Sequence, residues 1–351
     1  MRCFEHPFGH LNKTMKTKPQ TTNHPAFFLG IDVGKADLFC HLVAPGEVFS
    51  ERFDNTAKGI KSLIAWLSKA TASQTLAACL EQTGHYGDAI AQALHEFASG
   101  STFVVNPHRI KAFGMQKLRR NKSDTADAKL IARFIKSEHL ELRPWQPKSI
   151  TQQRITALSR FADSLTQDAA RLKTMLESQT EKAIIACLKR QIKAAQKEIA
   201  ALRAEIAKLI KEDPQLQTKN KLIQTIPGLG VIASQIVIAE LPDLELFSDA
   251  RQLAAWSGLT PCHHASGTSG RTRTPITKIG SVHLRRGLFM PAMTARVFNP
   301  LLKEFGDRLK TNGKSPKQII IAIMRKLLHQ IYGILKSGMP YNPNKRGFQN
   351  A

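Results

Sequence analysis

Closely spaced cysteine pairs are missing from this sequence. It has five cysteines in 351 residues, an odd number, and no two of them stand in a C-x-x-C pair. Disulfide frameworks and structural zinc sites both need cysteines at short, regular spacings. Cys262, His263 and His264 are adjacent, which steric geometry disfavours for a shared zinc ion. The sequence therefore argues against both classes and indicates a reducing, cytoplasmic location.

Long hydrophobic runs and acidic residues are also scarce. The sequence has no apolar run of roughly 18 residues and no lipidation motif, so a membrane is not the expected partner. Hydrophobic residues make up 42% of the chain, which is typical of a globular protein. Asp and Glu number 27 against 51 Lys and Arg, for a formal net charge of +24. This imbalance predicts a polyanionic partner, and nucleic acid is the favoured one.

Residues 26–145 are predicted to form an α/β domain behind a polar, disordered extension at 1–25. The predicted elements, in chain order, are strands at 27–35, 38–43 and 47–53, a helix at 57–70, a strand at 75–84, a helix at 86–98, a strand at 101–106, and helices near 107–117 and 124–137. The tight turns between the first three strands indicate an antiparallel meander. The order β-β-β-α-β-α-β-α is typical of a ribonuclease-H-like fold with three layers.

Residues 150–212 contain neither glycine nor proline and are predicted to be helical. Apolar residues from Ile185 to Leu209 recur at alternating spacings of three and four, as a coiled coil requires. An earlier apolar series, Leu158 to Met175, is out of phase with the later one. The pattern fits either one long helix with a register break or a hairpin of two helices. We interpret the segment as a coiled-coil dimerisation region, with a solvated helical spacer as the alternative.

Residues 215–343 are predicted to form a mainly helical C-terminal domain. The stretch IPGLG (226–230) lies between two apolar helical segments, which is the helix-hairpin-helix pattern. In that motif Gly228 and Gly230 would allow a tight turn that presents backbone N–H groups to a phosphate. A plain connection between two helices is the alternative. A basic loop at 263–280 and helices near 284–298 and 315–335 complete the domain.

Four acidic residues stand where a metal site would need them. Asp124 and Asp127 are three residues apart and share one helix face, although both also suit a helix N-terminus. Asp32 lies in the first predicted strand, and Glu81 ends the fourth. In a ribonuclease-H-like sheet these strands are neighbours and the last helix crosses their ends, so the four carboxylates would converge. Close carboxylates repel one another unless cations neutralise them, and two Mg²⁺ ions holding a phosphodiester would do so.

Basic residues form two clusters that suit a phosphate backbone. The first precedes the two aspartates and comprises Arg109, Lys111, Lys117, Arg119, Arg120 and Lys122. The second accompanies the glycine-containing loop and comprises Arg271, Arg273, Lys278, Arg285 and Arg286. Each residue alone is explained as a solvated surface charge, but the clustering favours nucleic acid.

Several motifs together carry a family resemblance. GIDVGK, CLEQTG, KSDTADAKLIARF, IPGLGVIAS and the ASGTSG loop leading into ITKIGSVHLRRGL resemble the DEDD-type transposases of the insertion sequence 110 family. The Piv site-specific DNA invertases are similar. The resemblance spans about residues 27–343 and keeps the motifs in the same order.

The resemblance implies a RuvC-like domain in which Asp32, Glu81, Asp124 and Asp127 bind Mg²⁺. It also implies a serine nucleophile in the C-terminal domain, matched here by Ser266. Ala265 stands where family members often carry Gln or Glu, and Ser269 lies close by as an alternative nucleophile. A homodimer or homotetramer, with the serine of one subunit meeting the acids of another, and a noncoding guide RNA from the element's ends are further implications.

Two other functions remain open from the residues. A structure-selective endonuclease of the resolvase type would use the same acids with a water nucleophile, and would form no protein–DNA adduct. A non-catalytic nucleic-acid-binding protein would bind equally well with all four acids neutralised. DNA cleavage in Mg²⁺ and a trapped adduct discriminate between the three.

Overall fold

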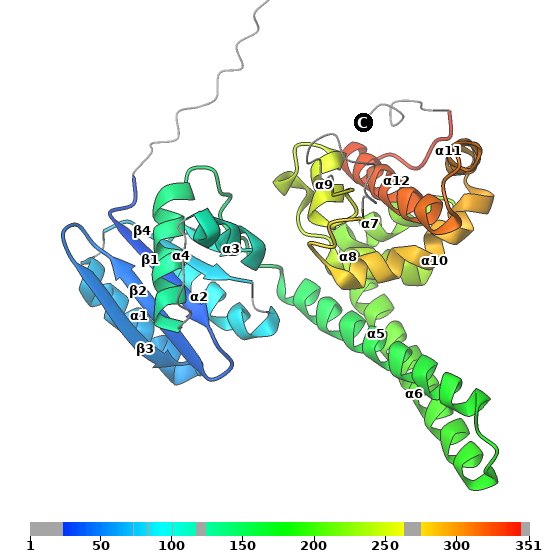
Figure 1. The fold of residues 1–351 in the computed structure, drawn as a ribbon, viewed down its shortest axis with the longest axis horizontal. Coiled ribbons are helices and arrows are strands. Elements are labelled where there is room, and N and C mark those ends of the chain that lie inside the picture. The colour runs from blue at the N-terminus through cyan, green and yellow to red at the C-terminus, as the bar shows by residue number, and fades with distance from the viewer. Residues whose placement is uncertain are drawn as a thin grey trace, which may run out of the picture. The chain divides into compact units, whose positions relative to one another are not determined.

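The computed structural model describes residues 24–344, except 73, 83, 100, 117–123 and 263–274. Most of the predicted N-terminal extension, residues 1–23, therefore lies outside the described part. The chain divides between Pro147 and Lys148 into two compact units. The first is a mixed α/β unit built on one sheet, and the second is helical (Figure 1).

The first unit has the predicted order of elements. These are β1 (Phe27–Val33), β2 (Asp37–Val43), β3 (Val48–Asp54), α1 (Ala57–Thr71), β4 (Leu76–Glu81), a 3-10 helix (Gly84–Gly87), α2 (Asp88–Phe97), β5 (Thr102–Val105), α3 (Pro107–Gln116) and α4 (Asp124–Glu138). The strands form one sheet in the order β3-β2-β1-β4-β5. β1, β2 and β3 pair antiparallel, whereas β4 and β5 run parallel to β1. The parallel pairs need crossover helices, which α1 and α2 supply.

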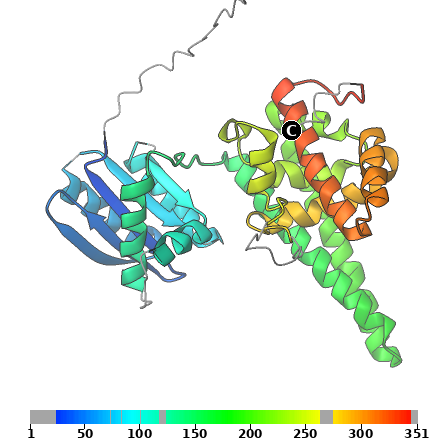
Figure 2. The ribbon, with the colours of Figure 1, turned by 45° about the horizontal axis from the view of Figure 1, so that its top comes forward.

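The helices of this unit cover both faces of the sheet (Figures 1 and 2). On one face, Leu29, Ile31 and Leu80 pack with apolar residues of α1 and α2. On the other face, Ala77 and Cys79 pack with residues of α3 and α4. Because side chains alternate along a strand, the residues of β1 and β4 are divided between these two cores.

Helix α4 lies directly on β1 at Gly30. A Cβ atom at Gly30 would lie 2.2 Å from the backbone nitrogen of Ala132 and 2.3 Å from the carbonyl oxygen of Ala128. Two residues earlier on the same face, the ring of Phe28 contacts that of His139, with centroids 5.2 Å apart. The earlier residue of β1, Phe28, thus contacts a later position along α4 than Gly30 does. The helix therefore runs antiparallel to the strand, and its first turn lies toward the C-terminal end of β1.

We expect Gly30→Ala to lower the free energy of unfolding by about 1–3 kcal/mol, because the added methyl group must push a helix backbone away from the sheet. Urea denaturation monitored by circular dichroism would measure the loss. Gly230→Ala is the control, because a Cβ atom there meets nothing within 4 Å. Its cost as a helix N-cap change is under about 1 kcal/mol. Equal losses in the two variants would contradict the proposed contact.

The second unit consists of α5 (Ile150–Glu177), α6 (Lys182–Glu212), α7 (Pro214–Gln224), α8 (Val231–Glu240), a 3-10 helix (Leu244–Leu246), α9 (Ala250–Trp256), α10 (Val282–Phe298), α11 (Pro300–Thr311) and α12 (Pro316–Ser337). Capping residues explain where α7 and α11 begin. Asp213 and Asn299 each accept bonds from the first turn of the next helix, and each is followed by a proline at the first helical position.

The segment predicted as a coiled coil is a hairpin of two helices, so the hairpin alternative is confirmed over the single long helix. α5 and α6 pack side by side and project from the rest of their unit (Figures 1 and 2). Leu188 and Ile192 of the apolar series are buried in this pairing, together with Ala162 and Ala169 of α5. Packing between α5 and α6 of the same chain thus accounts for the burial of these apolar residues of the coiled-coil pattern. A role in dimerisation stays a prediction.

The remaining helices pack around α12. This helix has the length and hydropathy of a membrane-spanning segment, but 56% of its most apolar window is buried within the unit. Ile323, Leu327 and Ile331 of α12 are buried in one core with residues of α8 and α10. Core helices of globular proteins share this length and composition, and α12 occupies such a central position.

Candidate active site

Three of the four predicted acids have described side chains, and they belong to one end of the sheet. Ile31 of β1 pairs with Leu80 of β4, so the next residues on these parallel strands are Asp32 and Glu81. Asp127 lies in the first turn of α4. All three side chains are half-buried, and each already makes a contact within the protein. Asp124 is the first residue of α4, and its side chain lies outside the described part.

The acids also face the same side of the sheet. Asp32 shares the face of Phe28 and Gly30, which α4 covers. Glu81 alternates onto the face of Ala77 and Cys79, which pack against α3 and α4. The chain thus directs the ends of two strands and the first turn of one helix toward one region. Among the side chains that the structure describes, however, no three His, Cys, Asp or Glu residues are grouped closely enough to hold a metal ion.

Basic residues flank this region on the α4 side. His41 of β2 pairs with Gly30 in the sheet, and its Nδ1 lies 2.7 Å from Ser50 Oγ. Burial lowers the pKa of His41, and the positive charges of Lys129 and Arg133 lower it further. Lys129 and Arg133 are exposed on α4, one turn apart. Neither residue is among those predicted from the sequence, although both recur at helical spacing within the KSDTADAKLIARF motif.

The predicted nucleophile lies in a loop that the structure does not describe. Ser266, Ser269, Arg271 and Arg273 fall within 263–274, and Lys117, Arg119, Arg120 and Lys122 fall within 117–123. The residues that flank 263–274 are described. Pro261 forms a β-bridge with Ile276, and Cys262 N donates to Pro275 O at 2.7 Å. The residues on either side of the loop are thus joined to each other.

Tight backbone packing continues below this base. Gly258 and Gly280 both have positive φ, at 74° and 119°. A Cβ atom at Gly280 would lie 1.9 Å from Trp256 O, so only glycine fits there. Arg285 Nη1 donates to Ser257 O and Gly280 O at 2.9 and 3.0 Å, and burial lowers the pKa of this guanidinium. Arg285 thus holds the backbone after the loop.

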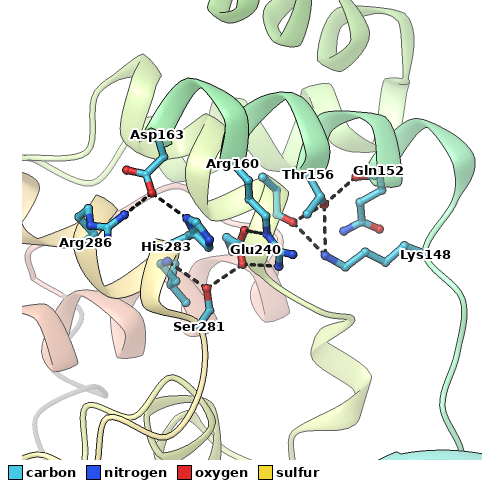
Figure 3. Close-up of polar contacts among 11 residues, drawn as sticks. Lys148, Gln152, Thr156, Arg160, Asp163, Glu240, Ser281, His283 and Arg286 are labelled. Carbon is cyan, nitrogen blue, oxygen red and sulfur yellow. Dashed lines mark hydrogen bonds and ion pairs between the residues drawn. The ribbon is translucent and has the colours of Figure 1, made fainter. Parts of the chain in front are cut away.

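A buried carboxylate fixes the start of α10 (Figure 3). Glu240, at the end of α8, is 3% exposed. Arg160 of α5 donates to both of its oxygens, at 2.8 and 3.1 Å, and Ser281 Oγ donates to Oε2 at 2.7 Å. Ser281 is itself the N-cap of α10, because its Oγ accepts from Leu284 N. One carboxylate therefore connects α5, α8 and the segment that follows the loop.

A second acid makes a parallel connection (Figure 3). Asp163 Oδ2 lies 2.7 Å from His283 Nδ1 and accepts from Arg286 Nη1 at 2.5 Å. Asp163 belongs to α5, whereas both partners belong to the first turns of α10. Arg285 and Arg286 are thus both held by contacts within the unit, and their predicted contact with phosphate stays a prediction. Lys278 has a positive φ of 56° on the backbone between the loop and α10.

Side chains from the start of α5 and from Lys148 just before it bind the C-terminal end of α8 (Figure 3). Lys148 Nζ and Thr156 Oγ1 donate to Ala239 O at 2.9 and 2.7 Å. Gln152 Nε2 donates to Leu241 O at 3.3 Å. The last carbonyls of a helix have no partner within that helix, so these bonds satisfy groups that burial would otherwise leave unpaired.

We expect Glu240→Ala to lower the free energy of unfolding by about 2–3 kcal/mol at pH 7. Burial raises the pKa of Glu240, but hydrogen bonds from Arg160 and Ser281 and nearby positive charge outweigh burial, so the pKa is lowered overall. A lowered folded-state pKa contributes stability above the unfolded pKa, and this contribution is lost as pH falls through the folded pKa. Loss of one partner of a buried pair costs about 3–5 kcal/mol, reduced here because the Arg160 side chain is 47% exposed.

Urea denaturation at several pH values would measure this cost. Glu205→Ala is the matched control, because Glu205 pairs with Arg154 on the exposed surface of the same hairpin at 3.4 Å. The control should cost under about 1 kcal/mol. A loss for Glu240→Ala no larger than that of the control would contradict the role of Glu240 as a connector of three segments.

The IPGLG turn joins α7 to α8. Gly228 has φ +104°, and a Cβ atom there would lie 2.6 Å from the Ala295 side chain and 2.8 Å from its backbone. Gly228 is therefore required by close packing against α10. Gly230 caps α8 without a side-chain bond, and Val231 and Ile232 beside it are exposed. Contact between this turn and a phosphate stays a prediction.

Comparisons with known proteins match most of the chain. A transposase family model of the DEDD and IS110 type matches residues 29–184, and a model of the IS116/IS110/IS902 transposase family matches residues 220–307. The pilin gene-inverting proteins of Moraxella bovis and Moraxella lacunata are each 31% identical over 323 residues, which cover 90% of this chain and 97% of each relative. The transposase for the insertion sequence element IS1111A of Coxiella burnetii is 24% identical over 216 residues, or 52% of this chain and 56% of the relative.

Proposed function

Because the chain belongs to the IS110 family of transposases, and is therefore a DNA transposase or recombinase, we propose that it cuts and rejoins DNA with a serine nucleophile assisted by four metal-binding acids. The observation that carries this proposal is the placement of Asp32 and Glu81 at the ends of adjacent parallel strands, on the face that α4 covers. Chain elements far apart in sequence thereby direct carboxylates toward one region.

We assign the first unit to the ribonuclease-H-like, RuvC-like class. The strand order β3-β2-β1-β4-β5 supports this, with an antiparallel meander followed by two parallel strands. We assign residues 221–241 to the helix-hairpin-helix class, which the positive φ of Gly228 and the uncapped start of α8 support. Both assignments agree with a protein that acts on nucleic acid.

The proposed metal ligands are Asp32, Glu81, Asp124 and Asp127. Their carboxylate oxygens are the donors that Mg²⁺ prefers, and their placement at one end of the sheet fits such a site. Bound Mg²⁺ supplies charge stabilisation at the oxygens of a scissile phosphodiester. The described acids belong to ordered strands and a helix, which would hold the donors in place.

The proposed covalent step involves Ser266. Its Oγ attacks phosphorus in line, so an Oγ–P bond forms while the bond from phosphorus to one strand-end oxygen breaks. The serine proton passes through a base or water to the departing oxygen, which leaves as a free DNA hydroxyl. Attack by the hydroxyl of another strand reverses these bond changes, so the backbone is restored without ATP.

The proposed partners are the DNA of the element's ends and target, a noncoding guide RNA, and further copies of this chain in a homodimer or homotetramer. The net charge of +24 supports a polynucleotide partner. The projecting α5–α6 hairpin supports a role in assembly, because its exposed apolar residues include Phe161 and Met175.

A trapping assay tests the proposed function. Purified protein is mixed with labelled DNA carrying the joined ends of the insertion element, RNA transcribed from those ends, and Mg²⁺, and denaturing gels then detect covalent products. We expect a protein–DNA adduct whose modified peptide contains Ser266 by mass spectrometry. Cleavage without any adduct would instead support a water-using endonuclease, and binding without cleavage would support a non-catalytic protein.

A further inference from the structure

A cluster of cations in the second unit belongs to neither of the basic clusters that the sequence predicts. Its members come from three helices: Arg251 from α9, Arg308 from α11, and Arg325 and Lys326 from α12. Burial lowers the pKa of Lys326, and the positive charges of Arg325, Arg308 and Arg251 lower it further. Each of the other three cations therefore lies close enough to Lys326 to repel its charge.

An aromatic ring positions two of these cations. Phe305 of α11 has the guanidinium carbon of Arg308 at 5.5 Å and the ammonium nitrogen of Lys326 at 5.8 Å from its ring centroid. Cations over an aromatic face are attracted by the ring quadrupole, so Phe305 favours a fixed placement of both charges. Arg308 and Lys326 are thereby held near each other across the junction of two helices.

Three members of the cluster have no acidic partner among the described residues. None of Arg308, Arg325 and Lys326 forms an ion pair there. Asp249, the acid on the α9 side, already accepts from Gln252 N as a helix cap. Arg325 and Lys326 are half-buried, so their mutual repulsion is weakly screened by solvent.

A buried histidine beneath the cluster adds a second, independent observation. His329 is 2% exposed, and neither ring nitrogen meets a hydrogen-bond partner among the described residues. Burial lowers its pKa to about 4, and the charges of Lys326, Arg325 and Arg251 contribute, with Asp249 opposing them. The imidazole is therefore neutral near pH 7, and the polar surroundings of the cluster are incomplete without a further group.

We propose that Arg251, Arg308, Arg325 and Lys326 form a binding site for the phosphodiester backbone of a polynucleotide. This inference rests on the proposed function only in taking DNA or RNA as the ligand. A phosphate supplies the negative charge that Arg308, Arg325 and Lys326 lack among the described residues, and it accepts hydrogen bonds from guanidinium and ammonium groups at once. Backbone contacts of this kind set the position of a nucleic acid without reading its sequence.

The salt dependence of binding tests the site. Affinity for a labelled DNA duplex and for the RNA is measured by fluorescence anisotropy without Mg²⁺, across a series of salt concentrations. Each lost phosphate contact should reduce the slope of log affinity against log salt by about 0.9 for duplex DNA or about 0.7 for a single strand. For Arg325→Gln/Lys326→Gln we expect a slope smaller by about 1 to 2 and an affinity lower by about 10-fold.

Matched variants separate this site from general charge. Lys58→Gln/Lys61→Gln removes the same charge from exposed positions on α1 and should leave the slope within about 0.3 of wild type. Arg308→Gln, on the exposed surface of α11, provides a second test if the half-buried pair does not tolerate substitution. A smaller slope for only DNA or only RNA identifies which nucleic acid binds at this site. Either result supports the proposed site.

An unchanged slope in both Arg325→Gln/Lys326→Gln and Arg308→Gln would overturn the site, while adduct formation by the same variants would leave the proposed function intact. Conversely, a reduced slope in protein that forms no adduct would support the site and count against the proposed chemistry. The two proposals therefore fail by different measurements.

Discussion

Asp32→Asn is expected to reduce Mg²⁺-dependent DNA cleavage by on the order of 10³-fold or more, with little loss of stability. Asparagine keeps the size of the side chain but removes the negative charge that a hard cation requires. A bound metal ion contributes several kcal/mol to stabilisation of a phosphoryl transition state, and about 1.36 kcal/mol corresponds to each factor of ten in rate. Asparagine keeps an oxygen that accepts hydrogen bonds at this position, so the free energy of unfolding should change far less than the cleavage rate.

Initial cleavage rates and urea denaturation of the same preparations would measure both effects. Asp37→Asn is the matched control, because Asp37 lies in the adjacent strand and pairs with the exposed Arg52 at 2.7 Å. The control should change the cleavage rate by less than about ten-fold, because it removes only a surface ion pair. Full cleavage activity in Asp32→Asn would refute a metal site that includes this residue.

Ser266→Ala is expected to abolish the protein–DNA adduct and reduce strand exchange by on the order of 10⁴-fold or more. Removal of a nucleophile takes away the covalent route itself, and the remaining groups give only a small residual rate. DNA affinity should stay close to that of wild type, because a serine hydroxyl contributes little to binding a highly charged backbone. The adduct assay and anisotropy titrations report the two quantities separately.

Ser269→Ala distinguishes the two serines of the ASGTSG loop. It should retain the adduct, since the resemblance places the nucleophile at Ser266. An adduct that survives in Ser266→Ala and disappears in Ser269→Ala would move the nucleophile to Ser269. Undiminished cleavage in both variants, with no adduct in wild type, would exclude serine chemistry altogether.

The strands of the first unit were predictable because local patterns determine them. Apolar runs such as FFLGIDV end at a glycine or at polar residues, and each corresponds to one strand. The role of Gly30 was not predictable in the same way. Its absent side chain makes room for the backbone of Ala128 and Ala132, roughly 100 residues later, and that contact exists only in three dimensions.

The hairpin shows where a periodic pattern is ambiguous. Apolar residues at spacings of three and four suit a pairing between two chains as well as a pairing within one chain. The turn between α5 and α6 contains Ser178, Gln179, Thr180 and Glu181, without glycine or proline. Ser178 and Glu181 nevertheless serve as the caps of the two helices. Because no glycine or proline marks this turn in the sequence, one long helix and a hairpin of two helices were both compatible with it.

The polar network around α10 was missed, although one signal for it was present. Glu240 follows nine residues of which most are apolar, and a lone acid at the end of such a helix is costly unless it is paired. Its partners, Arg160 and Ser281, lie 80 and 41 residues away. The cation cluster on α9, α11 and α12 was still less visible, because only Arg325 and Lys326 are neighbours in the chain.

Once α4 has been synthesised and packed on β1, the first unit has all the elements of its fold, well before the loop that contains Ser266 is made. The last acid at the sheet end, Asp127, leaves the ribosome roughly 140 residues before Ser266, which is a delay on the order of 10 s at typical translation rates. Within that interval the nascent chain can fold the sheet of its first unit, while Ser266 has not yet been added. Under the proposed chemistry, a nascent chain that ends before Ser266 therefore holds the acids without the nucleophile.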